Sequence, residues 1–317
     1  MIEAIGIGKS FGQVAALSSV DISVHAGTVH GLLGHNGAGK TTLINILCTV
    51  LPPDRGAARI AGYDVVGQSH EVRGRIGLTG QYAAVDENLS GTDNLILIAR
   101  LLGASRRQAR ARAHELLEIF DLTKAAHRPS RTYSGGMRRR LDLATSLVGR
   151  PDVVFLDEPT TGLDPSSRLA LWEVVEGIVR EGAAVLLTTQ YLDEADRLAG
   201  AITVLADGTV MASGTSAQLK SQVGSRAVHI VPADPADSGA VMRALGRAGL
   251  TPAQDAVTGS ISAPAETSAD LATVVRALDQ DRLDVTGFSL TEPTLDDVYL
   301  ALTHRTVRAG RPTALAN

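Results

Sequence analysis

Aromatic residues and surplus positive charge are both missing from this sequence. Only 4 Phe, 1 Trp and 5 Tyr occur among 317 residues, whereas a protein that stacks the bases of single-stranded nucleic acid needs more aromatic side chains. The formal net charge at pH 7 is −4, and a general nucleic-acid binder would be basic. The composition therefore argues against nucleic acid as a partner.

Cysteine and long apolar runs are also scarce. Cys48 is the single cysteine and cannot form an internal disulfide, so we expect a small buried apolar residue and see no sign of an oxidising compartment. No uninterrupted apolar run reaches ten residues, against about 18–20 needed to span a bilayer. The first ten residues lack the features of a signal peptide. These absences predict a soluble, cytoplasmic chain without a membrane span.

The length and the 44% content of hydrophobic residues are sufficient for two folded domains. Residues 1–30 alternate apolar and polar side chains, which predicts short antiparallel strands. An apolar run at 29–34, a glycine-rich turn and a helix over 40–50 follow, as in an α/β domain that binds phosphate at a helix N-terminus. Between about 86 and 149 the apolar spacing is helical, which indicates a helical subdomain within the α/β domain.

The α/β pattern resumes after this insertion and continues to a domain boundary that we place after residue 220. We expect strands at 153–156, 183–188, 202–206 and 209–212, and helices at 166–180 and 192–199. Residues 221–304 are predicted to form a small C-terminal α+β accessory module of ferredoxin-like β-α-β-β-α-β order, with a final amphipathic helix at 294–302. We expect residues 305–317 to be a disordered tail.

The segment from Gly34 to Thr41 has the pattern G-x-x-x-x-G-K-T and lies between a predicted strand and a predicted helix. Glycines allow the backbone N–H groups of such a turn to point at the phosphates of a nucleotide. Lys40 would place its charge at the terminal phosphates, and the Thr41 hydroxyl would bind Mg²⁺. The segment therefore predicts a nucleotide-binding loop.

Two carboxylates follow the apolar strand at 153–156. Asp157 is suited to hold magnesium through a water, and Glu158 to orient or deprotonate the water that attacks the γ-phosphate. An apolar strand followed by Asp-Glu also occurs at sheet edges without a catalytic role, so this interpretation depends on the neighbouring phosphate loop.

Between these two motifs, Ser134, Gly135 and Gly136 open a predicted helix. Ser134 is well placed to cap that helix, and the glycines leave its N-terminus open to an anion. A cap that touches no ligand is the alternative. The arginines that follow, Arg138 to Arg140, are expected on a solvated helix face or against a partner subunit.

Together, over roughly residues 1–220, these motifs resemble the nucleotide-binding subunit of ATP-binding-cassette (ABC) transporters. Residues 133–137, Tyr-Ser-Gly-Gly-Met, are similar to that family's LSGGQ signature, Gln81 to its Q-loop glutamine, residues 162–165 to its D-loop, and Phe11 to the aromatic residue that stacks on adenine. The resemblance implies a P-loop NTPase fold, in which an ABC-type nucleotide-binding domain has antiparallel β and helical subdomains.

The resemblance also implies the site residues. The implied ATP contacts are Phe11, Gly34, His35, Asn36, Gly37, Ala38, Gly39, Lys40, Thr41, Thr42, Gln81, Ser134, Gly135, Gly136 and Asp164. The implied magnesium ligands are Thr41, Gln81 and Asp157, and the implied catalytic residues are Glu158 and Gln190. In this family two subunits pack head to tail, and each ATP lies between the phosphate loop of one copy and the signature of the other.

Besides Tyr133 and Met137 in the signature, two positions depart from the family pattern. Gln190 stands where most members have a histidine that contacts the γ-phosphate, and glutamine donates an amide hydrogen bond but cannot become a cation. Glu158 should then contribute more to positioning the water. His35 replaces the usual proline of the phosphate loop; it lies near the phosphates or, as we favour, faces solvent.

Segments outside the shared motifs are similar to the daunorubicin/doxorubicin-resistance (DrrA) branch of the family. They are GQYAAVDENLSGTDNL (80–95), TYSGGMRRRLDLA (132–144), TTQYLDEADRLA (188–199) and FSLTEPTLDDVYLALT (288–303). The branch implies an ATPase subunit that powers efflux of a drug or similar amphipathic compound through a separate membrane permease, at the cytoplasmic face of the cell membrane. The accessory module would then stabilise the subunit or regulate its partner.

The alternative function is a soluble ABC ATPase that acts on translation or DNA without a membrane partner. Proteins of that class usually carry two cassettes in one chain or long coiled coils. This sequence has one cassette and no sustained heptad pattern, and its charge is not basic. These features favour the exporter.

Overall fold

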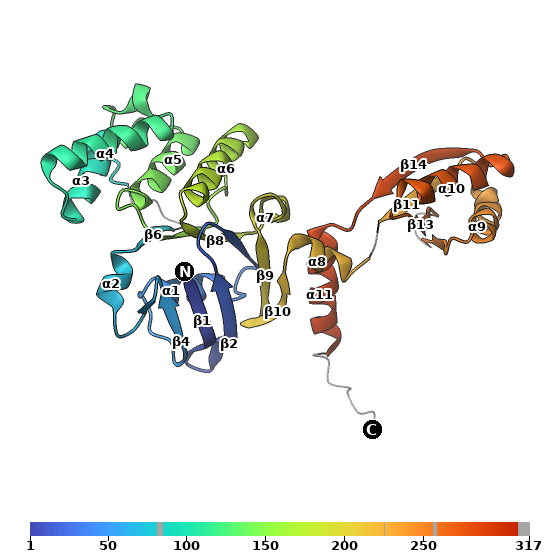
Figure 1. Ribbon diagram of the computed structural model, residues 1–317, viewed down its shortest axis with the longest axis horizontal. Helices are drawn as coiled ribbons and strands as arrows, with labels where there is room; N and C mark the ends of the chain where they lie inside the picture. Colours follow the sequence, from blue (N-terminus) through green and yellow to red (C-terminus); the bar gives the residue numbers. More distant parts are fainter. Residues whose placement is uncertain (81–84, 225, 256–258, 310–317) are drawn as a thin grey trace. The chain divides into compact units, whose positions relative to one another are not determined.

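The computed structural model describes residues 1–80, 85–224, 226–255 and 259–309, with side chains described as far as Leu302. It contains two compact units, Met1–Ser216 and Ala217–Asn317 (Figure 1). The division falls a few residues before the boundary that we placed after 220. Each unit has its own sheet structure and its own hydrophobic core.

An antiparallel sheet at the start of the first unit has the strand order β2-β1-β4-β5. Its strands are β1 (Ile2–Phe11), β2 (Val14–Val24), β4 (Arg55–Ile60) and β5 (Tyr63–Asp64). Alternate residues of β1 and β2 are buried, as the sequence pattern predicts, but the pairing runs from Ile2 with Val24 to Phe11 with Val14. The result is one long hairpin instead of the short strands expected.

The central sheet has the strand order β10-β9-β3-β8-β7-β6, and all neighbours are parallel except the edge strand β10. Its strands are β3 (Val29–Leu33), β6 (Ile76–Thr79), β7 (Val153–Asp157), β8 (Ala184–Thr189), β9 (Ala201–Ala206) and β10 (Thr209–Gly214). Every residue of β3, β7 and β8 is buried, as expected for parallel strands covered on both faces. Leu33 pairs with Thr189 and Asp157 with Thr188, so the carboxyl ends of these strands meet at one edge.

Four helices connect the strands of the first unit: α1 (Lys40–Leu47), α2 (Ser69–Arg73), α6 (Pro165–Arg180) and α7 (Leu192–Leu198). α1 ends before the predicted limit at residue 50, because Thr49 takes a left-handed backbone conformation with φ 63° ahead of Pro52. Cys48 is buried at the end of this helix, as predicted, and burial raises the pKa of its thiol.

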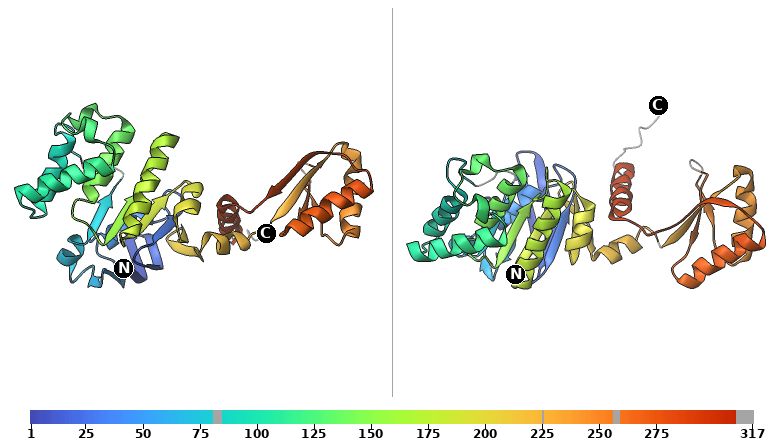
Figure 2. Two further views of the ribbon diagram at one scale, coloured as in Figure 1. Left: turned by 45° about the horizontal axis from the view of Figure 1, so that its top comes forward. Right: turned by 90° about the horizontal axis from the view of Figure 1, so that it is seen from above.

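The helical subdomain forms a lobe beside the sheets, coloured teal to green in Figures 1 and 2. It contains α3 (Gly91–Leu101), α4 (Arg106–Ile119), the 3-10 turns η1 (Thr123–Ala125) and η2 (Ser130–Thr132), and α5 (Gly135–Ser146). Ser90 and Ser105 cap its first two helices, and the Tyr133 hydroxyl donates a hydrogen bond to the Ala125 carbonyl at 2.7 Å. The lobe shares a core with β7, β8 and α6, which fixes α5 against the end of the sheet.

The second unit contains an antiparallel sheet of strand order β12-β13-β11-β14. From the boundary onward the elements are α8 (Ser216–Ser221), β11 (Ala227–Pro232), the 3-10 turn η3 (Pro235–Asp237), α9 (Ser238–Arg247), β12 (Ala253–Gln254), β13 (Ile261–Pro264), α10 (Ser268–Gln280), β14 (Val285–Thr291) and α11 (Leu295–Ala309). α9 and α10 share a core with β11 and β13. The β-α-β-β-α-β order confirms the ferredoxin-like prediction.

The final helix is longer than predicted. We expected a helix at 294–302 and a disordered tail at 305–317, but α11 continues to Ala309 and includes residues 305–309. The Thr294 hydroxyl accepts from the Asp297 N–H at 3.2 Å at the start of the helix, and no glycine or proline interrupts the sequence before Gly310. A helix can propagate where no such residue occurs, and α11 extends beyond the predicted end at 302.

One buried polar group in the central sheet is a histidine. His30 lies on β3 with 5% of its surface exposed, and its Nε2 is 2.9 Å from the Thr203 hydroxyl on β9. That hydroxyl is 3.0 Å from the Ser213 hydroxyl on β10. Burial lowers the pKa of His30 to about 4, because the charged imidazolium would lose its hydration inside the sheet. At a pH between about 4 and 6.5, His30 is therefore neutral in the folded chain and protonated in the unfolded chain.

We predict that acid weakens the first unit through His30. Between the ordinary pKa of 6.5 and about 4, the unfolded state binds more protons than the folded state, so stability falls as pH drops through this window. The loss between pH 7 and pH 5 should be about 2 kcal/mol. Urea unfolding of the wild type and of His30→Gln at both pH values measures it, because glutamine does not titrate. Equal losses in the two proteins would contradict the assignment.

Candidate active site

The loop from Gly34 to Gly39 joins β3 to α1 at the edge where the parallel strands end. Two of its glycines, Gly34 and Gly39, leave no room for side chains. A Cβ atom on Gly34 would lie 2.4 Å from the Leu205 carbonyl oxygen, and one on Gly39, where φ is 106°, would lie 2.6 Å from the Ala16 carbonyl oxygen. The same turn and the first turn of α1 contain the predicted contact residues Asn36, Gly37, Ala38, Thr41 and Thr42.

The Lys40 ammonium group is enclosed by this loop. Nζ donates to the Gly34 carbonyl at 2.6 Å and to the His35 carbonyl at 3.2 Å, and only 5% of the residue is exposed. Burial lowers the pKa of Lys40, and the nearby carboxylates of Glu158 and Asp157 oppose this shift. The two backbone carbonyls therefore hold the Lys40 ammonium beside two carboxylates. In this position, phosphate oxygens can replace the carbonyls as its hydrogen-bond acceptors.

Asp157 ends β7 and has a polar contact on each carboxylate oxygen. Its Oδ1 accepts from the Thr188 hydroxyl on β8 at 2.6 Å, and the Thr41 hydroxyl lies 3.4 Å from Oδ2. A threonine hydroxyl beside a carboxylate is the kind of oxygen ligand set that Mg²⁺ prefers, so this pair fits the predicted metal position. Gln81, the third predicted ligand, lies outside the described residues.

Glu158 follows in a left-handed backbone conformation with φ 50°, which is uncommon for a residue with a side chain. Its N–H donates to the carbonyl and the hydroxyl of Thr188, at 3.1 and 3.0 Å, and this fixes the turn. Gln190 Nε2 donates to Glu158 Oε1 at 2.7 Å and to Asn36 Oδ1 at 3.1 Å. One amide group thus links the carboxylate to the phosphate loop.

A buried carboxylate that the sequence did not single out anchors the helix after Gln190. Glu194 on α7 has no exposed surface and accepts from Trp172 Nε1 at 2.9 Å and from the Thr160 hydroxyl at 3.1 Å. Burial raises the pKa of Glu194. These contacts join α7, which follows Gln190, to α6 and to the segment that follows Glu158. They therefore fix the backbone next to both residues of the Gln190–Glu158 contact.

The two remaining motifs begin helices. Ser134 caps α5, as predicted, by accepting from the N–H three residues later at 3.2 Å. Asp164 caps α6 by accepting from the N–H and the hydroxyl of Ser167, at 3.0 and 2.7 Å. Hydrogen bonds from the Ser166 and Ser167 hydroxyls lower the pKa of Asp164 well below its usual value. A Cβ on Gly136 would lie 2.6 Å from Ser167 Oγ, so this glycine lets the two helix ends approach.

Not all predicted residues come together in one molecule. Within residues 1–80 and 85–224, no hydrogen bond or ion pair joins the signature residues 134–136 to the phosphate loop. Phe11 is half exposed at the end of β1, with Lys9 Nζ 5.9 Å from the centre of its ring. The His35 ring is turned toward Asp207, with Nε2 3.6 Å from the carboxylate and 44% of the side chain exposed.

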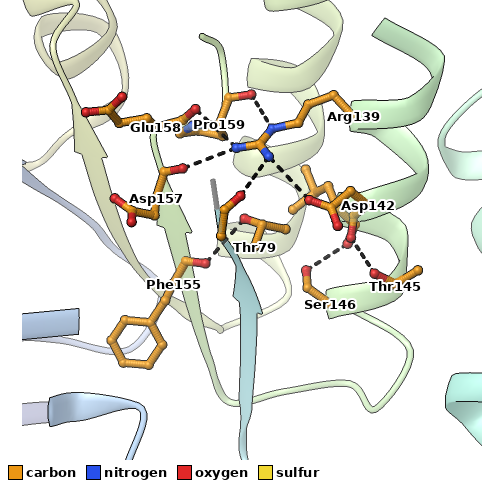
Figure 3. A network of polar contacts seen from close by, with 11 residues as sticks. Thr79, Arg139, Asp142, Thr145, Ser146, Phe155, Asp157, Glu158 and Pro159 are labelled. Carbon is orange, nitrogen blue, oxygen red and sulfur yellow. Dashed lines mark hydrogen bonds and ion pairs between the residues drawn. The ribbon is translucent and has the colours of Figure 1, made fainter. Parts of the chain in front are cut away.

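Sequence reasoning missed Arg139. We expected Arg138 to Arg140 on a solvated or partner-facing surface, which suits Arg138, since 37% of its side chain is exposed and it pairs with Glu87. The Arg139 side chain is only 14% exposed, and its guanidinium reaches the ends of β6 and β7 (Figure 3). The signal that could have found it is Asp142, one turn further along the same helix face and opposite in charge.

Comparison with known proteins agrees with this geometry. Residues 17–161 match the sequence profile of the ABC transporter family. The daunorubicin/doxorubicin resistance ATP-binding protein DrrA of Streptomyces peucetius is 47% identical over 303 residues, which cover 95% of this chain and 92% of the relative. The chain belongs to the ABC transporter family.

Solved members of the family share the fold. The ATP-binding subunit of an ABC transporter matches with a TM-score of 0.65 and 28% identity, over 70% of this chain and 92% of that one. A dimeric bacterial ABC transporter cassette matches with a TM-score of 0.63 and 24% identity, over 68% of this chain and 98% of that one. The predicted P-loop NTPase fold is confirmed, and the chain is an ATP-binding and ATP-hydrolysing ABC subunit. Among its described residues, no helix is both long and apolar enough to cross a membrane.

We predict that Gln190→Ala slows ATP hydrolysis by this ABC ATPase without abolishing nucleotide binding. The substitution removes the amide that links Glu158 to Asn36, whereas Lys40 keeps its contacts in the loop. The kcat should fall about tenfold or more, and KM for ATP should change less than about threefold.

Steady-state ATPase measurements on the full-length variants test this, with Gln108→Ala as the matched control. Gln108 also uses its side chain in a local hydrogen-bonded motif, the capping box of α4, but lies in the helical lobe. A Gln190→Ala enzyme with the kcat of the wild type would show that the amide link is not needed.

Proposed function

We propose that the chain is the ATP-hydrolysing subunit of an exporter, which couples hydrolysis to efflux of a drug or similar amphipathic compound through a separate membrane permease. It would act at the cytoplasmic face of the cell membrane. One observation carries the hydrolytic part: the Gln190 amide joins Asn36 to Glu158 and so keeps the carboxylate at the phosphate loop. Similarity to a drug-resistance protein over nearly the whole chain supports the transport part.

In the proposed reaction, ATP lies along the phosphate loop, with adenine on the exposed ring of Phe11 and the terminal phosphates at Lys40. Backbone N–H groups of the loop and the Lys40 ammonium stabilise the phosphate charge. Glu158 accepts the proton of the attacking water, while Gln190 orients that carboxylate. Magnesium, held by Thr41, Asp157 and, as the family resemblance implies, Gln81, would neutralise further phosphate charge when bound.

The proposed working unit is a head-to-tail dimer of two identical chains. The N-terminus of α5 at Ser134 is suited to bind an anion, yet within residues 1–80 and 85–224 it makes no hydrogen bond to its own phosphate loop. A second copy would bring this N-terminus to the γ-phosphate, with Asp164 at the same interface, and an isologous interface then forms two equivalent sites. The dimeric cassette of the same fold supports this arrangement. ATP would favour the closed dimer because only that state binds it from both sides.

We predict that Glu158→Gln traps the ATP-bound dimer. The amide keeps the shape of the side chain but cannot accept the proton of the attacking water, so ATP binds and is not consumed. Turnover should fall by about a hundredfold or more. With magnesium ATP, the full-length variant should elute as a stable dimer in size-exclusion chromatography.

The matched control for this variant is Glu173→Gln, which makes the same chemical change at an exposed position of α6. It should hydrolyse ATP like the wild type and should not accumulate a dimer. Undiminished turnover by Glu158→Gln would refute the role of that carboxylate.

Reconstitution tests the transport part of the proposal. We expect ATP hydrolysis to rise when the full-length chain is assembled in liposomes with a candidate membrane permease and daunorubicin or doxorubicin is added. Fluorescence of the anthracycline then reports whether the compound crosses the bilayer in an ATP-dependent way. Lys40→Ala is the control for hydrolysis. Neither stimulation nor transport, in a complex that hydrolyses ATP, would contradict export of these compounds.

A further inference from the structure

Every N–H bond of the Arg139 guanidinium has a hydrogen-bond acceptor. A guanidinium has five N–H bonds, and this one makes five polar contacts. Nε donates to the Pro159 carbonyl at 2.8 Å, Nη1 to the Gly80 carbonyl at 2.9 Å and to Asp142 Oδ2 at 3.3 Å, and Nη2 to the carbonyls of Asp157 and Glu158 at 3.2 and 3.1 Å. Figure 3 shows the side chain reaching from α5 to these strand ends.

The four carbonyl groups belong to the segments that carry the proposed reacting residues. Gly80 follows β6, and 157–159 are the last residue of β7 and the two that follow it. Regular pairing stops at these points, where carbonyl groups need other donors. Glu158 has its left-handed conformation here, so the guanidinium holds the backbone on both sides of the catalytic carboxylate.

The other end of the same side chain belongs to the signature helix. Arg139 lies on α5, the helix that Ser134 caps. Asp142, on the next turn and 2% exposed, holds the guanidinium from the helix side. Because a guanidinium is planar and presents its donors in a fixed fork, it transmits a displacement of α5 to the strand ends better than a flexible contact would.

We propose that Arg139 is a positioning residue for ATP hydrolysis: it holds the backbone of Glu158 in its reactive conformation and couples that turn to the signature helix of the same subunit. The inference rests on the proposed roles of Glu158 and Ser134. Arg139 contacts the carbonyl of Glu158 and not its carboxylate, so it acts through the backbone. Docking of Ser134 on the nucleotide of a partner would reach the Glu158 turn through this contact.

Arg139→Lys tests the proposal because it keeps the charge but not the fork of donors. A lysine ammonium has three donors at one point and cannot satisfy acceptors spread over two strand ends. The kcat of the full-length variant should fall about 10- to 100-fold through misplacement of the catalytic group. Because Lys40 and its loop are untouched, KM for ATP should change less than about threefold.

The matched control is Arg112→Lys. The Arg112 side chain is 17% exposed, donates to the Leu147 and Val148 carbonyls at 2.6 and 3.3 Å, and pairs with Glu115 at 2.7 Å. It therefore loses similar contacts, but inside the helical lobe and away from the strand ends. Both lysine variants should lower the melting temperature, and only Arg139→Lys should lower kcat.

Glu158→Gln, measured in the same assay, separates failure of the inference from failure of the proposed function. If Glu158→Gln turns over like the wild type, the role of Glu158 is wrong whatever Arg139 does. If Glu158→Gln is inactive and Arg139→Lys has the kcat of Arg112→Lys, only the Arg139 proposal is overturned.

Should Arg139→Lys not fold, Arg139→Gln replaces it, with the same expected loss of kcat. Failure of both Arg139 variants to fold, beside a folded Arg112→Lys, would make Arg139 purely structural and would also overturn the proposal.

Discussion

The parallel strands β3, β6, β7 and β8 end at one edge of the central sheet, where backbone carbonyl groups need donors from outside the ladder. Two cations, the buried Lys40 and the mostly buried Arg139, supply many of these donors. Lys40 donates to the carbonyls after β3, and Arg139 donates to those after β6 and β7. The same cations lie near Asp157, whose negative charge partly opposes the lowering of their pKa values by burial. The cationic side chains of Lys40 and Arg139 therefore fix the backbone at the ends of the strands. That backbone in turn positions the carboxylates of Asp157 and Glu158.

The two cations are not equivalent, and the difference matches what each has to do. The Lys40 ammonium is a compact charge on a flexible stem, and its two carbonyl contacts within the loop can be exchanged for phosphate oxygens when a nucleotide binds. The Arg139 guanidinium is rigid and has all its donors engaged, so exchange would leave several buried carbonyls and the Asp142 carboxylate without this partner. Lys40 is therefore suited to bind the ligand, whereas Arg139 is suited to keep α5 and the strand ends joined when the ligand binds.

The features that could be predicted from the sequence are those that depend on short segments. The loop from Gly34 to Thr41 and the Ser134 cap each lie within a few consecutive residues, and the strand and helix segments read one by one gave the β-α-β-β-α-β order of the second unit. Asp142 could have marked Arg139 as a paired side chain, but its carbonyl acceptors could not be found in this way, because Gly80 lies 59 residues before it and Pro159 lies 20 residues after it. Helical periodicity shows which face an arginine shares, but it does not show which strand ends that face meets. The length of α11 was underestimated because its last residues have no apolar pattern that predicts a helix. Only the lack of a glycine or proline favours their helical conformation.

The neutral amide of Gln190 suits a site organised in this way. An imidazole in its place would gain or lose a proton near neutral pH, whereas Gln190 Nε2 remains a donor throughout. Its two acceptors, Glu158 Oε1 and Asn36 Oδ1, belong to the turn after β7 and to the phosphate loop. While Glu158 is ionised, the hydrogen bond to it is charge-assisted and strong. In the proposed reaction the carboxylate takes the proton of the attacking water, and that bond would then weaken. The protonation state of Glu158 would thus be transmitted to the phosphate loop through an amide that does not itself titrate.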